Sequence, residues 1–284
     1  MHTCAFPYFS LPAIRLALAG ARVGVIVDWH EVWSSEYWRG YLGPVAGQVG
    51  HAIQRVCALL TPRAFVFSQL HADRLRREGM RGPIVILRGQ LPAPPARLEE
   101  REAARAPVVV FAGRQIPEKR AHVLPAAVAV ARRTIPGLRA RIYGDGPERS
   151  HVEAEVERWG VSGAVDLLGF VDRDEVDRAI GDALCLVLPS AREGYGRVVV
   201  EAAAQGTPSI VVAGPDNAAS ELIEEGENGF VAPSTEPDDL AAAIVRAHRE
   251  GAALRRRTAA WFARHAEELD LATSLRRVRE AYGL

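Results

Sequence analysis

The amino-acid sequence predicts an α/β protein made of two Rossmann-like domains, the first smaller than the second. From Pro107 onward, short continuous apolar runs alternate with helical patterns. Such an alternation is typical of a parallel sheet covered by helices on both faces. The residues before 91 show the same alternation with fewer strands, and the segment 91–107 between them is rich in Pro, Ala and charged residues. This segment is the best candidate for a domain boundary.

The domain limits follow from this alternation. We expect a partial N-terminal domain over residues 1–95 and a linker over 96–106. The second Rossmann-like domain is expected over 107–255, and C-terminal helices over 256–284. A chain of 284 residues is long enough for two domains of ordinary size.

In the second half, each apolar run is followed by a helical pattern, and Asp172 is a plausible N-cap for one of the helices. Strands are expected over residues 108–113, 138–144, 164–170, 184–188, 208–214 and 229–233. Helices are expected over residues 121–133, 150–160, 172–183, 217–226 and 236–251, with a further one after Gly196.

The first half and the tail complete the expected elements. In the first half, strands are expected over 21–27, 63–68 and 83–89, and helices over 12–19, 44–60 and 71–79. Met1-His2-Thr3 is similar to the end of a further, middle strand. The tail 252–284 predicts two amphipathic helices. Their apolar anchors are Trp261, Phe262, Leu269, Leu271, Leu275 and Val278.

Composition excludes several classes of protein. Lys plus Arg and Asp plus Glu each number 35, so no net field favours nucleic acid as a partner. Cys4, Cys57 and Cys185 are far apart and show no CxxC spacing, which argues against disulfides and a zinc site. No apolar run reaches the roughly 20 residues of a membrane span, and no signal-peptide pattern is present. We therefore expect a cytoplasmic protein.

The strongest candidate site surrounds two glutamates eight positions apart. Glu193 follows the apolar run 184–188, the turn Gly194-Tyr195-Gly196 comes next, and a helix then carries Glu201. Main-chain N–H groups at the start of a helix attract phosphate. Carboxylates beside such a site fit the hydroxyl groups of a sugar. The alternative is that both glutamates are surface acids of an amphipathic helix.

A basic pair follows the first strand of the second half. In the run FAGRQIPEKR, Arg114 and Lys119 come just after the strand, where they are able to neutralise a diphosphate. Ligands of open α/β sheets bind outside the carboxyl ends of the strands, which is where this run lies. The alternative is a solvated charged loop.

In the first half, His30 comes just after the strand expected to end at Val27. Its position at the strand exit favours a functional role, although a single histidine is often structural or exposed. An aromatic-rich loop surrounds it, suited either to stacking on a sugar or to packing a domain interface: Trp29, Trp33, Tyr37, Trp38 and Tyr41. A basic run, Arg74, Arg76 and Arg77, is either a contact for an anionic acceptor or membrane surface, or merely solvated.

These motifs together resemble the retaining GT-B glycosyltransferases of glycosyltransferase family 4. Glu193 and Glu201 match the Glu-x7-Glu signature within PSAREGYGRVVVEAAAQGTP, and Arg114 with Lys119 matches Gly-Arg-x4-Lys, although Arg120 stands where the family often has Gly. YGDGPE, with Gly144 and Gly146, is similar to the family's Gly-Asp-Gly-Pro turn, for which a structural role is favoured. LLGFV and the His-Glu pair at His30 match further elements.

The resemblance implies a role for each matched residue. Glu193 would bind donor sugar hydroxyls and Glu201 the ribose. Main-chain atoms of Phe170 and Val171 would contact the base, with Phe170 as a core residue the alternative, and the N–H groups of Gly194, Tyr195 and Gly196 would approach the phosphates. The implied catalytic set is His30, Glu193, Arg114 and Lys119, with His30 beside the reacting carbon and the two cations on the leaving diphosphate. No metal and no cofactor are implied.

The resemblance also implies fold and function. The fold is the GT-B architecture with a truncated N-terminal domain, since the first strands of that domain and their Gly-rich loop have no counterpart here, and the tail crosses back toward the first domain. The implied reaction transfers a hexose with retention from a nucleoside-diphosphate sugar to a hydroxyl group of a glycan, lipid or small-molecule acceptor.

The apparent truncation keeps other functions open. One is a non-catalytic sugar-nucleotide-binding subunit, and another is a degenerate glycosyltransferase that needs a partner chain for the remaining strands. Peripheral contact with the inner membrane face and oligomerisation also stay open. A nucleotide-sugar 2-epimerase is a weaker alternative, against which the spacing of Glu193 and Glu201 argues.

Overall fold

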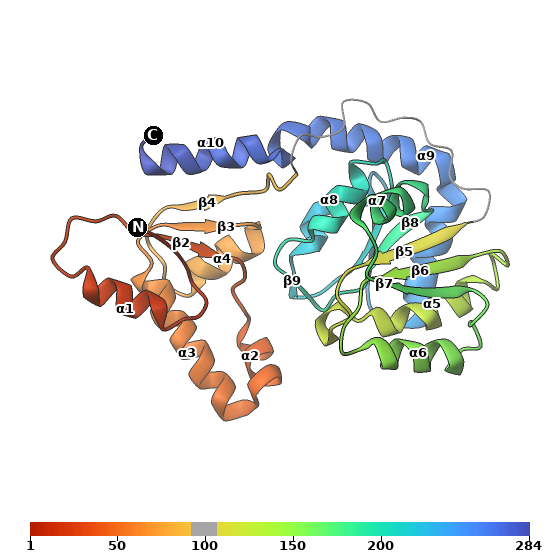
Figure 1. Ribbon diagram of the computed structural model, residues 1–284, viewed down its shortest axis with the longest axis horizontal. Helices are drawn as coiled ribbons and strands as arrows, with labels where there is room; N and C mark the ends of the chain where they lie inside the picture. The colour runs from red at the N-terminus through yellow and green to blue at the C-terminus, as the bar shows by residue number, and fades with distance from the viewer. Residues whose placement is uncertain (92–106) are drawn as a thin grey trace.

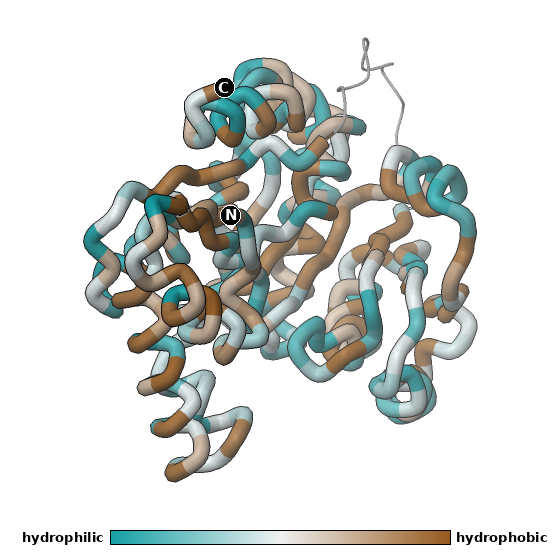
Figure 2. Tube along the Cα trace, turned by 60° about the vertical axis from the view of Figure 1, so that its left-hand side comes forward, coloured by the Kyte–Doolittle hydropathy of each residue, from teal (hydrophilic) through white to brown (hydrophobic). Residues whose placement is uncertain are grey.

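The computed structural model of the protein describes residues 1–91 and 107–284. Figure 1 shows two α/β units side by side, each built on its own sheet, with the last two helices running across both. The expected linker 96–106 lies outside the described residues. In Figure 2, apolar residues concentrate in the strands, while polar residues are frequent on the outer helices.

The first unit contains a parallel sheet in the order β1-β2-β3-β4. Its strands are β1 (His2–Cys4), β2 (Ile26–Trp29), β3 (Ala64–Val66) and β4 (Ile84–Ile86). Its helices are α1 (Ser10–Ala17), α2 (Ser35–Leu42), α3 (Pro44–Leu60) and α4 (Gln69–Arg77). Strand β1 confirms the strand end expected at Met1-His2-Thr3.

Two local predictions in the first unit were wrong. The strand expected over 21–27 begins only at Ile26 and continues to Trp29, so His30 follows it directly. The aromatic loop contains the helix α2, which was not predicted and which carries Tyr37, Trp38 and Tyr41. This helix is fixed by its N-cap, because the Ser34 hydroxyl accepts a 3.0 Å hydrogen bond from the main-chain N–H of Tyr37.

The second unit contains a six-stranded parallel sheet in the order β12-β10-β8-β5-β6-β7. Its strands are β5 (Val108–Ala112), β6 (Arg139–Tyr143), β7 (Val165–Gly169), β8 (Cys185–Leu188), β10 (Ser209–Val212) and β12 (Gly229–Ala232). Covering helices are α5 (Leu124–Ala131), α6 (Arg149–Arg158), α7 (Arg173–Asp182) and α8 (Arg197–Ala203). Because β8 and β10 are buried along their whole length, they have the continuous apolar pattern that the sequence shows.

Short elements depart from the expected pattern. The helix expected over 217–226 is only a 3-10 turn, η3 (Ala218–Leu222). Before α5, the chain forms two further 3-10 turns, η1 (Pro117–Lys119) and η2 (Ala121–Val123). The loops after β8 and β10 add a small parallel pair, β9 (Arg192–Glu193) with β11 (Asp216–Asn217).

The tail connects the two units. Helix α9 (Pro237–Leu269) is interrupted at Gly251, whose φ is 48°, and α10 (Leu271–Tyr282) follows. Figure 1 shows α10 above β4 of the first unit, where Arg277 Nη1 donates to the carbonyl of Ile86 at 2.8 Å. Val278 packs on the small cluster formed by Ile26, Phe65 and Leu87.

The apolar anchors expected in the tail are only partly confirmed. Trp261, Phe262 and Leu269 are buried, but Leu271 and Leu275 are 37% and 54% exposed. The prediction was wrong for these two, because the buried positions of α10 are Thr273 and Ser274. Among the described helices, none combines the length and apolarity needed to cross a membrane.

Candidate functional site

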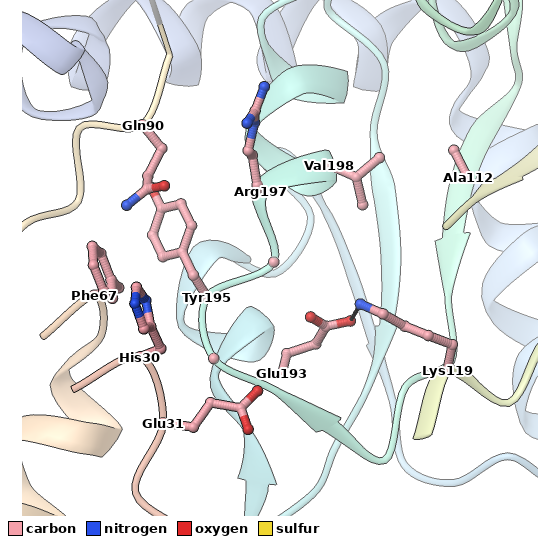
Figure 3. A pocket seen from close by; sticks show the side chains of 12 residues that line it. His30, Glu31, Phe67, Gln90, Ala112, Lys119, Glu193, Tyr195, Arg197 and Val198 are labelled. Atoms are coloured by element: carbon pink, nitrogen blue, oxygen red, sulfur yellow. Dashed lines mark hydrogen bonds and ion pairs between the residues drawn. The ribbon is translucent and has the colours of Figure 1, made fainter. Parts of the chain in front are cut away.

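A pocket of about 380 Å³ lies between the two units (Figure 3). The first unit and the segment that follows it line one side with His30, Glu31, Phe67 and Gln90. The second unit lines the other side with Ala112, Lys119, Glu193, Gly194, Tyr195, Gly196, Arg197 and Val198. The pocket therefore brings together five residues expected in the site from the Glu193 and Lys119 motifs, and His30 from the other half.

Glu193 is the buried anion of this pocket. Its Oε1 lies 2.5 Å from Lys119 Nζ and accepts a hydrogen bond of 2.7 Å from Ser190 Oγ, and the residue is only 7% exposed. The pairing of β9 with β11 fixes the main chain at Glu193, while η1 presents Lys119 from the loop after β5. In Figure 3 the two side chains point toward one another.

The turn after Glu193 needs glycine for two different reasons. A Cβ on Gly194 would lie 2.7 Å from the carbonyl oxygen of His30, so this residue is where the main chains of the two units meet. Gly196 has a φ of 95°, and a Cβ there would lie 2.6 Å from that of Ala219. Between them, Tyr195 donates from its hydroxyl to the carbonyl of Arg88 at 2.5 Å, and burial raises its pKa.

His30 faces the turn from the first unit. Its ring stacks on Phe67 with 5.1 Å between ring centroids and an interplanar angle of 5°. Its Nε2 lies 4.0 Å from Cys4 Sγ. Since His30 is exposed and lines the pocket, its ring is accessible to a ligand there.

Four residues expected in the site do not line this pocket. Arg114 is exposed in the loop after β5, and Val171 is partly exposed. Phe170 is 78% exposed, which excludes the alternative that it is a core residue. Glu201 is ion-paired with Arg173 at 3.0 Å and with Arg197 at 2.9 Å, and only Arg197 lines the pocket. Their predicted contacts with a donor stay predictions.

The turn at Gly144 and Gly146 has the structural role that the sequence favoured. A Cβ on Gly144 would lie 2.1 Å from the carbonyl oxygen of Gly113, and one on Gly146 would lie 2.3 Å from that of Gln115. The buried Gln115 donates from Nε2 to the carbonyl of Gly144 at 2.7 Å. The two glycines thus allow the loops after β5 and β6 to pack main chain against main chain.

Arg192 is the centre of a polar cluster that sequence reasoning missed. Its guanidinium is ion-paired with Glu31 of the first unit and lies 3.4 Å from Glu118 Oε1. It also lies 4.7 Å from the ring centroid of Trp33 and 4.8 Å from that of Tyr37. Burial lowers the pKa of Arg192. Trp33 and Tyr37 therefore pack at the domain interface, which was one of the two interpretations left open. Trp29 and Trp38 are instead buried within the first unit, and Tyr41 is 59% exposed.

A second interdomain cluster overturns the expected basic face at Arg74. Arg74 is only 7% exposed, and its Nη1 lies 2.5 Å from Asp216 Oδ1 of the second unit. The hydroxyl of Ser34 donates to the other oxygen of Asp216 at 2.8 Å. Both predictions for Arg74, a solvated side chain and a contact with an anionic surface, were therefore wrong. Its guanidinium is buried in an ion pair between the two units.

His71 completes this interface. The main-chain N–H of Val32 donates to its Nδ1 at 3.1 Å, and the side chain is buried. Burial, followed by the positive charge of Arg74, lowers the pKa of His71 to about 4. The ring is therefore neutral near pH 7.

Sequence comparisons place this arrangement in a family. Residues 96–260 match the family model described as glycosyl transferases group 1. An exopolysaccharide phosphotransferase of Streptomyces coelicolor is 32% identical over 165 residues, which make up 57% of this chain and 17% of that protein. The alpha-D-kanosaminyltransferase of Streptomyces kanamyceticus is 30% identical over 203 residues, 69% of this chain and 52% of the relative. The chain thus spans about half or less of the length of these relatives.

Solved structures agree on the fold. Sucrose-phosphate synthase from Thermosynechococcus elongatus superposes with a TM-score of 0.80 at 19% identity, covering 99% of this chain and 72% of that one. Anabaena HepE, solved in a complex with UDP, gives a TM-score of 0.77 at 21% identity, with coverages of 97% and 76%. From the family match and these neighbours, we conclude that the chain has the GT-B architecture and belongs to the glycosyl transferases group 1 family.

Proposed function

We propose that the protein is a retaining glycosyltransferase that moves a hexose from a nucleoside-diphosphate sugar to a hydroxyl group of an acceptor. The observation that carries the proposal is the Lys119–Glu193 pair, which lies in a pocket lined by both units. The buried carboxylate and the cation offer complementary contacts for sugar hydroxyls and for a diphosphate. The family match and the complex of HepE with UDP support a nucleotide-bound donor.

In the proposed donor complex, the charge of Lys119 is shared between Glu193 and the donor phosphates. The N–H groups of the turn 194–196 lie on the same wall and would add main-chain donors. Arg114, exposed after β5, would reach the diphosphate from outside the pocket. This set is a metal-independent way to stabilise the leaving diphosphate, an electrostatic contribution of several kcal/mol at most.

Two contacts are proposed at the nucleoside end. Glu201 would bind the ribose, which requires it to exchange one of its arginine partners for the diol. Main-chain atoms of Phe170 and Val171, at the end of β7, would contact the base. The exposure of Phe170 leaves that strand end accessible.

Retention is proposed to occur by attack of the acceptor on the same face from which the diphosphate departs. Among the lining residues in the described part of the chain, the carboxylates are Glu31 and Glu193, and each is ion-paired. Neither is therefore well suited to form a covalent glycosyl intermediate. His30, exposed on the opposite wall, is proposed to contact the sugar beside the reacting carbon.

The decisive experiment combines donor binding with turnover. The full chain would be titrated with UDP and GDP and their glucose and mannose conjugates, and each donor would be incubated with a panel of glycan, lipid and small-molecule acceptors. Proton NMR of the product would give its anomeric configuration. Retained configuration supports the proposal. Donor binding without hydrolysis or transfer would instead support a non-catalytic binding subunit.

Variants test the assigned residues. We expect Glu193→Gln, which keeps the shape of the side chain, and Lys119→Ala each to lower kcat by about 100-fold or more. Arg133→Ala, an exposed arginine of the same unit, is the matched control and should be silent. Thermal unfolding curves that match the wild type would exclude a loss of fold. Near-wild-type turnover in either pocket variant would refute the assignment.

A further inference from the structure

Two histidines and a glutamate converge on the second unit, outside the pocket. His122 belongs to η2, and Glu148 and His151 lie at the start of α6. His151 Nδ1 lies 3.1 Å from Glu148 Oε2, and His122 Nδ1 lies 3.8 Å from the same oxygen. The potential ligand atoms of all three residues lie within 4.8 Å of one another.

The geometry is close to that of a metal site. Zinc binds imidazole nitrogen and carboxylate oxygen at about 2.0–2.2 Å, so two ligand atoms of a tetrahedral site are about 3.3 Å apart. The two nitrogen-to-oxygen distances here, 3.1 and 3.8 Å, lie on either side of that value. The two imidazole rings are stacked, with 4.3 Å between centroids and 15° between planes.

The interactions present in the protein leave one of these nitrogens unsatisfied. His122 Nδ1 is buried and has no hydrogen-bond partner among the residues that the structure describes. Burial, followed by the nearby His151, lowers the pKa of His122. A neutral imidazole with an unused buried nitrogen is costly as a purely structural feature, and it is the form of histidine that binds a metal.

We propose that His122, Glu148 and His151 form a binding site for a divalent transition metal of the zinc class. Two imidazoles and one carboxylate are a donor set that suits zinc better than calcium or magnesium. When the metal binds, His151 carries its proton on Nε2, so that Nδ1 presents its lone pair. Water supplies the remaining coordination. The charge of Glu155 favours the cation and that of Arg120 opposes it.

The site joins two segments that shape the donor side of the protein. His122 is three residues from Lys119, in the loop after β5. Glu148 follows the Gly-Asp-Gly-Pro turn after β6, and its main-chain N–H donates to the carbonyl of Gln115 at 3.0 Å. A bound metal therefore crosslinks the loops after β5 and β6, and its role is structural rather than catalytic.

A second group of possible ligands, Cys4, Asp28 and His30, has to be separated from this site in any test. Its thiol gives the means to do so, because cobalt bound to thiolate shows a strong charge-transfer absorption. Cobalt bound only to imidazole and carboxylate lacks that absorption and shows weaker visible d–d bands.

The experiment uses the full chain without a polyhistidine tag, freed of metal with a chelator. Titration with ZnCl2 by calorimetry should give one saturable site, and Zn²⁺ should raise the Tm of the wild type. Addition of CoCl2 should give d–d bands without thiolate charge transfer. His151→Ala, a half-exposed position, should weaken Zn²⁺ binding at least about tenfold and remove the Tm increase.

Two further variants make the result specific. Glu148→Gln should weaken binding in the same direction, while His248→Ala, an exposed histidine of α9, should bind as the wild type does. Metal-free Tm values equal to that of the wild type show that the variants fold. The proposal is overturned by an absence of saturable binding in the wild type, by unchanged affinity in His151→Ala, or by a thiolate band in the cobalt spectrum.

Discussion

The two halves of the chain contribute to the pocket in different ways. The second half supplies a buried carboxylate, Glu193, whose Oε1 contacts both Lys119 and Ser190, on a six-stranded sheet with a large core. The first half supplies an exposed ring, His30, on a four-stranded sheet with smaller apolar clusters. The wall of the pocket in the second half is therefore preorganised, whereas the other wall depends on how the halves are held together.

What holds the halves together is mostly polar. Arg74 pairs with Asp216, Arg192 with Glu31, and Tyr37 donates to Glu118 at 3.0 Å. Interfaces of this kind are typical of domains that move relative to one another, because they lack the large apolar area of a core. The first half is also covered by α10, which comes from the other end of the chain. Removal of single interdomain contacts tests how far the first half depends on the second.

The largest effect is expected for Asp216→Ala. Arg74 would be left buried without its carboxylate, with the carbonyls of Val32 and Pro215 as its remaining acceptors among residues 1–91 and 107–284. We expect the free energy of unfolding, measured by urea titration, to fall by about 3 kcal/mol.

A matched pair of variants shows whether the buried charge is the cause. Arg74→Met combined with Asp216→Ala should recover part of the loss, because no charge is then left unpaired. Glu36→Ala, whose side chain is 74% exposed, should change stability little. If Asp216→Ala is as mild as Glu36→Ala, the halves do not depend on this pair.

The difference between contacts within one half and contacts between the halves also explains which features the sequence could predict. Strands of the second half are recognisable because β8 and β10 are buried on both faces and are therefore continuously apolar. The motif around Glu193 was found because its residues are close together in the chain. Arg74 and Asp216 are 142 positions apart, and no local pattern marks a pair that forms only when two units meet.

Two other errors have local physical causes. Helix α2 was missed because its aromatic residues obscured the helical period, although Ser34 as a possible N-cap and Glu36 in the first turn were available N-terminal signals. The strand before His30 was placed too early because Val23 and Val25 continue its apolar pattern, whereas only Val25 is buried. A sequence pattern shows which residues are apolar, whereas their burial depends on the other segments of the chain that pack against them.

The free energy of unfolding should depend on pH through His71, which is buried at the interface between the two units. The pKa of His71 in the folded protein is about 4, below the ordinary value of about 6.5. Between these values the unfolded chain binds more protons, so the free energy of unfolding falls as pH decreases from about 6.5 to 4. The loss from this residue is about 3 kcal/mol at most.

A variant separates this contribution from other titrations. His71→Asn retains an acceptor for the N–H of Val32 but does not titrate. Its unfolding free energy, measured by urea titration at several pH values, should therefore have a shallower slope across the window. His248→Asn, an exposed control, should keep the wild-type slope. Equal slopes in His71→Asn and the wild type would show that His71 is not buried as a neutral ring in solution.

The smallest effect is expected where the second half caps a helix of the first. Glu221, in η3, accepts hydrogen bonds from the main-chain N–H groups of Gln69 at 2.8 Å and Leu70 at 2.5 Å, at the start of α4. A carboxylate at a helix N-terminus is stabilising both as an acceptor and as a negative charge. Glu221→Ala should lower the free energy of unfolding by about 1 kcal/mol.

Glu221→Gln keeps an acceptor without the charge and should lose less stability, whereas Glu224→Ala in the same loop should be neutral. If Glu221→Ala matches Glu224→Ala, the N-terminus of α4 is stabilised without help from the second half, and the dependence of the first half on its neighbour rests on the other interdomain contacts, led by Arg74 with Asp216.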